Sequence, residues 1–418
     1  MDYFSKEKSL KQELEISYIL GKDILEGESM QHLRGVSFLG VLNIAARVPE
    51  QLRFSRYEHS ISVAYLTWLF CQNLRLREEI SLIATLSALI HDFTHPPFSH
   101  STEVYLQMRS GFETKHTSVL TQQKITKVLR EGYNSFPVQL KKYEPDRLAS
   151  QLYNLLHDRE ERKNYHPYIA DIFDTPFCPD TFDGINRAWY ALNTKEVKHR
   201  LNTKNIKYHG TIEPTSLISF ISSTTNYPFI YKSAWPPSKA NLIFKFHDLM
   251  RALYSDIIYS DWQSSAMVMF ARALEIAYLH AKFFRVDQDE TDVIEKINRN
   301  PISNKLYELI LTGHSFYSVS QENPSLYKLS LEYYTKAKRQ KKSYKEIKRL
   351  IESIVANKLK VNENLVFWHR FRPLIWSADN LHFKQFGKDE NLWLLQWHPS
   401  EGKPSIESEI EIYYTRSL

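Results

Sequence analysis

The chain has 418 residues, of which 43% are hydrophobic and 24% charged, and its formal net charge is +6. This length predicts two or three structural units, or one large core with appended lobes. The 11 glycines and 17 prolines are too few for a collagenous, linker-rich or disordered chain. Its two cysteines, Cys71 and Cys178, exclude a disulfide framework and a thiolate zinc site, so we expect an intracellular, reduced protein.

The first 20 residues are charged and amphipathic, and they lack the apolar run and cleavage site of a secretory signal. No stretch approaches the roughly 18 uncharged apolar residues that a transmembrane helix requires. We therefore expect a cytoplasmic protein without a membrane partner.

Two long apolar runs, residues 57–74 and 78–92, predict helices that are buried on most sides. Pro96 and Pro97 must end the second helix, because a residue before proline is pushed out of the helical region. Amphipathic helices are expected at 117–129 and 145–158, and Pro179 with Asp180 opens another helix.

The second half of the chain is less regular. Residues 204–240 are rich in Ser, Thr and Pro and predict loops with short strands, whereas residues 242–284 return to a helical pattern. Alternation at residues 409–414 predicts a strand. The predicted fold class is mainly α, with a helical core over residues 1–290 and a smaller α+β C-terminal lobe over residues 291–418.

The positive charge is concentrated in one block. Residues 336–349 contain eight Lys or Arg and one Glu, a net charge of +7, so the other 404 residues sum to −1. The block predicts either contact with the phosphates of a nucleotide or nucleic acid, with Tyr344 among the cations, or only a solvated charged surface. The overall charge therefore does not indicate whole-surface affinity for nucleic acid.

Three His-Asp dipeptides occur, at residues 91–92, 157–158 and 247–248, so the dipeptide alone is uninformative. The first differs because Asp92 ends an apolar run, where a charge is costly unless it is paired or bound to a metal. His59 starts the preceding apolar helix, and three further histidines follow the dipeptide: His95, His100 and His116. Imidazole and carboxylate groups together suit a divalent cation. Each histidine taken singly could equally be structural.

The pattern R-Y-E-H at residues 56–59 and H-D-x-x-H-x-P-F-S-H at residues 91–100 resembles the HD-domain deoxynucleoside triphosphate triphosphohydrolases. These include bacterial dGTPases and the mammalian SAM-and-HD-domain dNTPase. The close match covers residues 28–120, with weaker echoes to about residue 275. The resemblance implies an HD-domain helical core and metal-dependent cleavage of a dNTP, with dGTP the leading candidate, to deoxynucleoside and triphosphate.

The resemblance also implies four metal ligands: His59, His91, Asp92 and Asp180. Asp183 is the alternative to Asp180, since Asp180, Asp183 and Arg187 share one helix face. Asp183 and Arg187 could equally form an ordinary i,i+4 surface pair. The ion would be Mg, Mn, Co, Fe or Zn. Gly184 departs from the family, in which a substrate-contacting tyrosine often stands at this position.

The family's catalytic histidines match His95 and His116, which would transfer protons; Thr117 follows the second where relatives usually have Glu. The implied substrate-binding residues are Arg56, Lys115, Arg251 and Tyr259, the last as a sugar contact. An exposed helical arginine and a core tyrosine are the alternatives for Arg251 and Tyr259. Phe38 and Ser260 replace two glutamines of relatives, so the resemblance leaves base and sugar preference open.

Two other functions stay open. The same metal ligands would serve a nucleotidase or cyclic-nucleotide phosphodiesterase of the HD superfamily, and a nucleotide- or nucleic-acid-binding regulatory protein would use the basic block instead. The resemblance further implies a homo-oligomer with a regulatory nucleotide between subunits. Nucleotide-pool housekeeping and antiviral defence would use the same residues.

Overall fold

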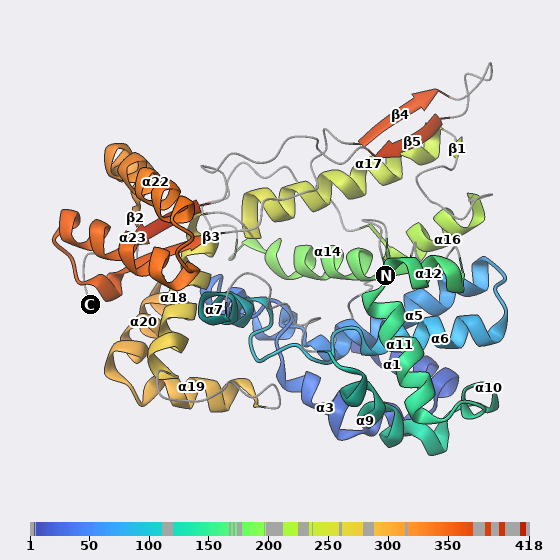
Figure 1. Ribbon diagram of the computed structural model, residues 1–418. Coiled ribbons are helices and arrows are strands. Elements are labelled where there is room, and N and C mark those ends of the chain that lie inside the picture. The colour runs from blue at the N-terminus through green and yellow to red at the C-terminus, as the bar shows by residue number, and fades with distance from the viewer. Residues whose placement is uncertain are drawn as a thin grey trace.

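A computed structural model describes the following residues: 4, 6–110, 120–166, 169, 172–173, 178–195, 197, 212–224, 234–235, 237–258, 261–278, 288–313, 317–370, 381–385, 393–397 and 410–414. As predicted, they are mainly helical (Figure 1), with two small antiparallel sheets. Among them, no helix combines the length and apolar character needed to cross a membrane.

The two apolar runs form α5 (Arg56–Asn73) and α6 (Glu78–Ile90), which pack against each other. A capping box starts α5: the Ser55 hydroxyl oxygen accepts a hydrogen bond from the backbone N–H of Glu58, and the Glu58 carboxylate accepts one from the backbone N–H of Ser55. Every residue of α6 from 80 to 90 is buried. Both predicted helices are confirmed, and each delivers a predicted ligand near one end.

The other elements of the N-terminal half are short to medium helices. They are α1 (Lys6–Leu20), α2 (Lys22–Glu26), α3 (Glu28–Gln31), η1 (His32–Gly35), α4 (Val41–Ala45), η2 (Glu50–Leu52), α7 (His100–Ser110), α9 (Gln122–Gly132), η3 (Tyr133–Ser135), α10 (Val138–Lys141), α11 (Pro145–His157), α12 (Arg159–Tyr165) and α14 (Pro179–Leu192). The helix expected at 117–129 starts later, because Thr121 caps α9 by accepting a hydrogen bond from the backbone N–H of Lys124. Pro179 opens α14 as predicted.

Residues 204–240 are only partly as predicted. The loop prediction is wrong at α16 (Pro214–Thr224), whose Leu217 and Ile218 are fully buried beneath a Ser- and Thr-rich exterior. The strand prediction is met by the two-residue β1 (Ala234–Trp235). The helical pattern that follows divides into α17 (Pro237–Arg251), the π-helix η5 (Ala252–Ile258) and α18 (Asp261–Ala277).

The C-terminal part adds helices and both sheets. Its helices are α19 (Glu290–Asn298), α20 (Pro301–Thr312), α21 (Val319–Glu322), α22 (Pro324–Arg339), α23 (Tyr344–Leu359) and η6 (Glu363–Leu365). One sheet has the order β2 (Tyr317–Ser318), β6 (Ile410–Tyr414), β3 (Val366–Arg370); the other has β1, β5 (Trp393–Trp397), β4 (Leu381–Gln385). Val366 pairs with Tyr414 and Arg370 with Ile410, so the strand predicted at 409–414 is confirmed.

Strand β3 joins two hydrophobic cores. Phe367 packs with α4, α7, α18 and α20, whereas Val366 and Trp368 pack with α22 and α23, because successive strand residues point to opposite faces. The first of these cores contains residues from both sides of the predicted boundary at residue 290. The C-terminal helices are therefore anchored on α18, next to α7 and the site described below.

Candidate metal centre and active-site pocket

One cavity of about 630 Å³ collects most of the predicted site residues. His59 lies in the first turns of α5, His91 caps the C-terminal end of α6, and Asp180 lies in the first turn of α14. Asp92 and His95 follow α6 directly. Residues more than 120 positions apart in the sequence thus meet at the ends of three helices.

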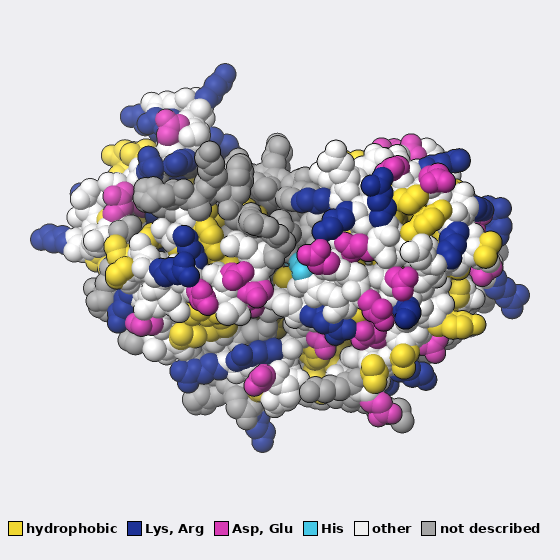
Figure 2. Space-filling model, turned by 90° about the horizontal axis from the view of Figure 1, so that it is seen from below, with side chains coloured by type: hydrophobic (Ala, Val, Ile, Leu, Met, Phe, Trp, Pro, Cys, Tyr) yellow, Lys and Arg dark blue, Asp and Glu magenta, His cyan; other side chains and the backbone are white. Residues whose placement is uncertain are grey.

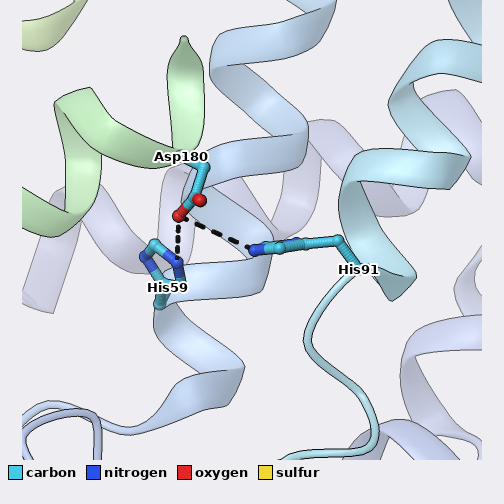
Figure 3. A group of neighbouring side chains, drawn as sticks. All are labelled: His59, His91 and Asp180. Carbon is cyan, nitrogen blue, oxygen red and sulfur yellow. Dashed lines mark hydrogen bonds and ion pairs between the residues drawn. The ribbon is translucent and has the colours of Figure 1, made fainter. Parts of the chain in front are cut away.

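The side chains of His59, His91 and Asp180 point toward one another (Figure 3). Nε2 of His59 lies 3.0 Å from Oδ1 of Asp180, and Nε2 of His91 lies 3.7 Å from the same oxygen. Asp92 adds its two oxygens, one 3.3 Å from Nε2 of His91 and the other 3.6 Å from Nε2 of His59. Two imidazole nitrogens and two carboxylates therefore converge.

This donor set fits a divalent cation. Ligands bound about 2.1 Å from a metal at tetrahedral or octahedral angles stand about 3.0–3.4 Å apart, close to the separations of the converging nitrogens and oxygens. Nε2 of His91 is buried without a hydrogen-bond partner, which is the arrangement expected of a metal-binding nitrogen. Imidazole ligands favour transition metals such as Zn, Fe, Mn and Co, whereas sites built only from oxygen ligands favour Mg or Ca.

The two imidazoles are held in the orientation that a metal requires. Nδ1 of His59 is hydrogen-bonded to Oδ2 of Asp183 at 2.7 Å, and Nδ1 of His91 to the backbone oxygen of Ala88 at 2.7 Å. In a neutral imidazole with Nδ1 donating, Nε2 carries the lone pair. Both lone pairs are then directed at the space between the carboxylate oxygens, where a cation would lie.

Asp183 and Arg187 form the predicted i,i+4 pair, but the prediction that this pair lies on the surface is wrong. The side chains are 0% and 1% exposed, and Arg187 reaches Asp183 with Nε at 2.8 Å and Nη2 at 3.0 Å. Burial alone would raise the pKa of Asp183, but Arg187 and His59 lower it to about 2. Asp183 is therefore a charged hydrogen-bond acceptor for His59.

Asp92 is buried, and cations surround it. Nη1 of Arg56 lies 2.7 Å from Oδ2, and Nε2 of His95 lies 3.2 Å from Oδ1. Burial alone would raise the pKa of Asp92, but His91, His95 and Arg56 lower it well below the usual range. Likewise, burial opposes protonation of His91, whereas Asp92 and Asp180 raise its pKa to about 9. Metal binding would therefore displace a proton from His91.

Arg56 holds residues around the site together through its hydrogen bonds. Besides Asp92, its Nε donates to Oγ of Ser99 at 2.9 Å, its Nη2 donates to the backbone oxygen of Phe38 at 3.3 Å, and it stacks on the Phe38 ring. Only 3% of Arg56 is exposed. The structure therefore places this predicted phosphate-binding residue as the partner of Asp92, at the wall of the pocket.

A second histidine pair lies beside the metal ligands. His95 is fully buried, and its ring meets the edge of His100 with centroids 4.8 Å apart. His100 is exposed, lines the pocket and is hydrogen-bonded through Nδ1 to Oε2 of Glu103 at 2.8 Å. A carboxylate-oriented imidazole of this kind is suited to proton transfer.

The loop between α6 and α7 is strained at the pocket. Phe98 and Ser99 have φ of 60° and 49°, which non-glycine residues adopt at a cost of about 1–3 kcal/mol each. Three contacts hold the loop: Oε1 of Glu290 accepts from the backbone N–H of Phe98 at 2.9 Å, Ser99 donates to the backbone oxygen of Ser37, and Ser99 accepts from Arg56. These contacts offset the strain and hold the loop between His95 and His100, which both line the cavity.

Phe38 and Gly184 line the same cavity beside His59. The Phe38 ring lies 4.8 Å from the His59 ring, and a Cβ on Gly184 would stand 3.6 Å from Cζ of Phe38 and 3.8 Å from Cε1 of His59. Two of the positions where this chain departs from the family are thus neighbours. Both line the cavity beside the candidate ligand His59.

The structure does not describe the side chains of four predicted site residues. Lys115, His116 and Tyr259 lie outside the described residues, and Arg251 ends α17 with its side chain outside the description. Their predicted contacts with substrate remain predictions.

Sequence reasoning did not identify Glu103 and Glu290 as residues of this region. Glu103 follows His100 by three positions on a helix, a spacing that indicates a pair. Glu290 is 192 positions from Phe98, and nothing in its local sequence points to the loop.

Known proteins resemble this chain at the level of the domain and the fold. Residues 56–175 match the HD domain family. Deoxynucleoside triphosphate triphosphohydrolase SAMHD1 homolog of Dictyostelium discoideum is 23% identical over 184 residues, which cover 42% of this chain and 34% of that protein. The chain spans about a sixth to a half of the length of the curated relatives it matches.

Two crystal structures share the fold over nearly the whole chain. A hypothetical protein from Aquifex aeolicus has a TM-score of 0.58 and 17% identity, covering 97% of this chain and 92% of that one. A phosphohydrolase from Bacteroides thetaiotaomicron has a TM-score of 0.58 and 12% identity, covering 94% and 95%. With the His-Asp geometry above, the family match leads to one conclusion: residues 56–175 form an HD domain.

Proposed function

We propose that the protein is a metal-dependent phosphohydrolase of the HD superfamily and that its substrates are dNTPs, with dGTP the leading candidate. Water would attack the α-phosphorus, the bond from phosphorus to the 5′-oxygen would break, and deoxynucleoside and intact triphosphate would leave. The observation that carries this proposal is the convergence of His59, His91, Asp92 and Asp180 at one cavity.

The size of the cavity and the names of similar proteins support the substrate class. A volume of about 630 Å³ is in the range of small-molecule sites and suits a nucleotide. The Dictyostelium relative is named a deoxynucleoside triphosphate triphosphohydrolase homolog, and the Bacteroides structure a phosphohydrolase. The sequence motif at residues 91–100 favours the same substrates.

The four converging residues would hold the cation. Once bound, a divalent ion lowers the pKa of a coordinated water and neutralises charge on phosphoryl oxygens. Asp183 and Ala88 keep both imidazoles aimed at the ion, and Arg56 keeps Asp92 ionised and in place.

Proton transfer would fall to His95 and His100. The leaving 5′-oxygen must gain a proton and the attacking water must lose one, and imidazole does both near neutral pH. His100 is the better placed to exchange a proton with substrate or solvent, because it is exposed and oriented by Glu103, whereas His95 is buried against Asp92. His116 is the further predicted participant.

Cationic side chains would hold the triphosphate. Arg251 and Lys115 are the predicted clamps, and Tyr259 the predicted sugar contact. All three guanidinium nitrogens of Arg56 already donate, to Asp92, Ser99 and the backbone oxygen of Phe38. Arg56 would therefore contribute its positive charge from the pocket wall rather than a clamp on the phosphates. The homo-oligomer and the regulatory nucleotide remain predictions of the same resemblance.

The test is turnover of the four dNTPs, singly and in mixtures, with Mg, Mn and Co, followed by ³¹P NMR. We expect intact triphosphate and deoxynucleoside, and loss of turnover in His91→Ala/Asp92→Ala. Mixtures are needed because an enzyme that requires a nucleotide activator is silent on single substrates. Release of orthophosphate alone would instead favour a nucleotidase, and turnover of cyclic nucleotides a phosphodiesterase.

A further inference from the structure

The basic block forms the tip of a helical hairpin. α22 and α23 pack against each other and lie at the end of the molecule opposite α10 (Figure 1). The turn between them consists of Gln340, Lys341 and Lys342, and Ser343 caps α23. We use the name basic tip for residues 336–349.

The eight cations of the basic tip divide into one structural lysine and seven exposed side chains. Lys348 is 3% exposed and lies 3.1 Å from Glu352 and 3.2 Å from Glu275. The exposed cations are Lys336, Lys338, Arg339, Lys341, Lys342, Lys345 and Arg349. Lysine and arginine side chains also project from this end of the molecule in Figure 2.

A buried ionic cluster fixes the hairpin to the core. Arg272 of α18 lies 2.5 Å from Glu352 of α23 and 3.1 Å from Glu275, and the backbone N–H of Trp368 donates to Glu352. The basic tip is therefore carried by a rigid support rather than by a free tail.

Helix stability explains only part of the exposed charge. Lys336, Lys338 and Arg339 lie in the last turn of α22, where cations favour the helix dipole. Lys341 and Lys342 lie in the turn between the C-terminal end of α22 and the N-terminal end of α23, and Lys345 lies in the first turn of α23, where a cation opposes the dipole. Lys341 also has a φ of 56°, which is costly for a lysine. Glu346, the acid of this turn, is engaged in the capping box with Ser343. The two dipoles act in opposite directions on the turn, and the dipole of α23 disfavours Lys345, so helix stability does not account for this second group of cations.

We propose that the basic tip binds a nucleic-acid duplex through its phosphate backbone. Seven exposed cations lie on two helices and their turn. Such cations can contact phosphates, which are the same at every position of a nucleic acid and so need no reading of the bases. Residues at i,i+4, such as Lys345 and Arg349, stand about 5–6 Å apart on the helix surface. They can therefore reach successive phosphates of one strand.

The composition of the basic tip favours a duplex over other polyanions. Membrane-surface helices bury large apolar side chains beneath their cations, and none of the large exposed apolar residues in the described part of the chain belongs to the basic tip. Single-strand binding relies on a series of exposed aromatic platforms. Among the described side chains next to the tip, Tyr333 is 38% exposed and Tyr334 is buried, so they offer no such series. This proposal does not depend on the chemistry of the pocket.

The test is fluorescence anisotropy of a labelled DNA duplex of about 20 base pairs with the full chain, over a salt series from about 50 to 200 mM. The tip variant is Lys341→Glu/Lys342→Glu/Lys345→Glu. The matched control is Lys11→Glu/Arg147→Glu/Lys358→Glu, which changes the net charge equally at exposed positions elsewhere. A Lys→Gln version of the tip variant covers the case in which charge reversal unfolds the lobe.

We expect the tip variant to bind the duplex at least about tenfold more weakly than the control. Each lost phosphate contact lowers the slope of log affinity against log salt by about one, so the Gln version should lower it by up to about three. Equal affinity of tip variant and control, or no duplex binding at low salt, overturns the proposal. So does tighter binding to oligo-dT or to vesicles containing anionic lipid than to the duplex.

Discussion

Nδ1 of His59 is hydrogen-bonded to Oδ2 of Asp183 at 2.7 Å, and both side chains are buried. Asp183 lies one helical turn after Asp180, so the two acids of α14 meet opposite nitrogens of the same imidazole. One acid can bind the metal beside His59 while the other orients the ring. The guanidinium of Arg187, which lies over the rings of Phe4 and Phe54, keeps the orienting acid ionised.

Replacing the orienting acid should weaken metal binding without removing a ligand. We expect Asp183→Asn to lower the affinity for Mn or Co about 10- to 100-fold, the usual effect of losing a hydrogen-bond partner of a metal-bound histidine. Chelator competition measures this change. The same variant leaves the buried Arg187 without its ionised partner and should lower the free energy of unfolding by about 3–5 kcal/mol.

The double variant Asp183→Asn/Arg187→Gln separates the two effects. It removes the buried charge, so much of the stability should return while metal affinity stays low. Recovery of metal affinity together with stability would mean that Asp183 acts only through folding.

Glu290 should control the strained loop from outside the pocket. Its Oε1 accepts from the backbone N–H groups of Phe98 and Ser37 and from the Ser37 hydroxyl. Glu290→Ala leaves these donors without an acceptor, at about 1–3 kcal/mol for each buried group. We expect kcat to fall while metal affinity stays near that of the unmodified protein.

Glu290→Gln is the matched control, because the amide oxygen can still accept both backbone hydrogen bonds. It should retain most of kcat. Equal losses in the Gln and Ala variants would show that the charge of Glu290, rather than its hydrogen bonds, matters.

The sequence was sufficient to place the candidate ligands near helix ends, and for a physical reason. An ionised Asp92 at the end of an apolar run demands a partner, and the runs themselves gave α5 and α6 with nearly correct bounds. Partners far apart in the chain could not be predicted from the sequence. Glu290 reaches Phe98 across 192 positions, and the burial of Asp183 depends on how α14 packs against α5. α16 was missed because Ser and Thr dominate its composition while Leu217 and Ile218 do its packing.

Gly184 tests how much of the pocket the substrate needs. A Cβ at this position makes only ordinary contacts with Phe38 and His59, and glycine inside a helix costs about 0.5–1 kcal/mol relative to alanine. Gly184→Ala should therefore raise the melting temperature and keep most activity. Gly184→Leu extends into the cavity beside His59 and should raise KM for dNTPs several-fold or more.

Measuring melting temperature and KM on both variants distinguishes space from stability. If Gly184→Leu keeps the original KM, the nucleoside does not occupy this part of the cavity. If Gly184→Ala is destabilised, the contact with Phe38 is tighter than its 3.6 Å separation indicates.

The ionic cluster beneath the basic tip should make the stability of the C-terminal part depend on pH. Burial alone would raise the pKa of Glu275, but Lys348 and Arg272, at 3.2 and 3.1 Å, lower it below its ordinary value. A carboxyl group whose pKa is lower in the folded than in the unfolded chain stabilises the fold above its unfolded pKa. That stabilisation is lost as the pH falls through the folded pKa. Because the Glu275 side chain is one-third exposed, the effect should be about 1 kcal/mol or less.

We expect Glu275→Gln to be less stable than the unmodified protein at pH 7, with a difference that shrinks from about pH 5 downward as the unmodified carboxyl is protonated. Urea unfolding at a series of pH values measures this difference. Glu332→Gln, at an exposed position of α22, is the control and should show little dependence on pH. A deficit in Glu275→Gln that stays constant down to about pH 3 would show that Glu275 contributes through the shape of its hydrogen bonds. In that case the two cations that hold α23 on α18 would owe their stability to Glu352, whose carboxylate lies within 3.1 Å of both.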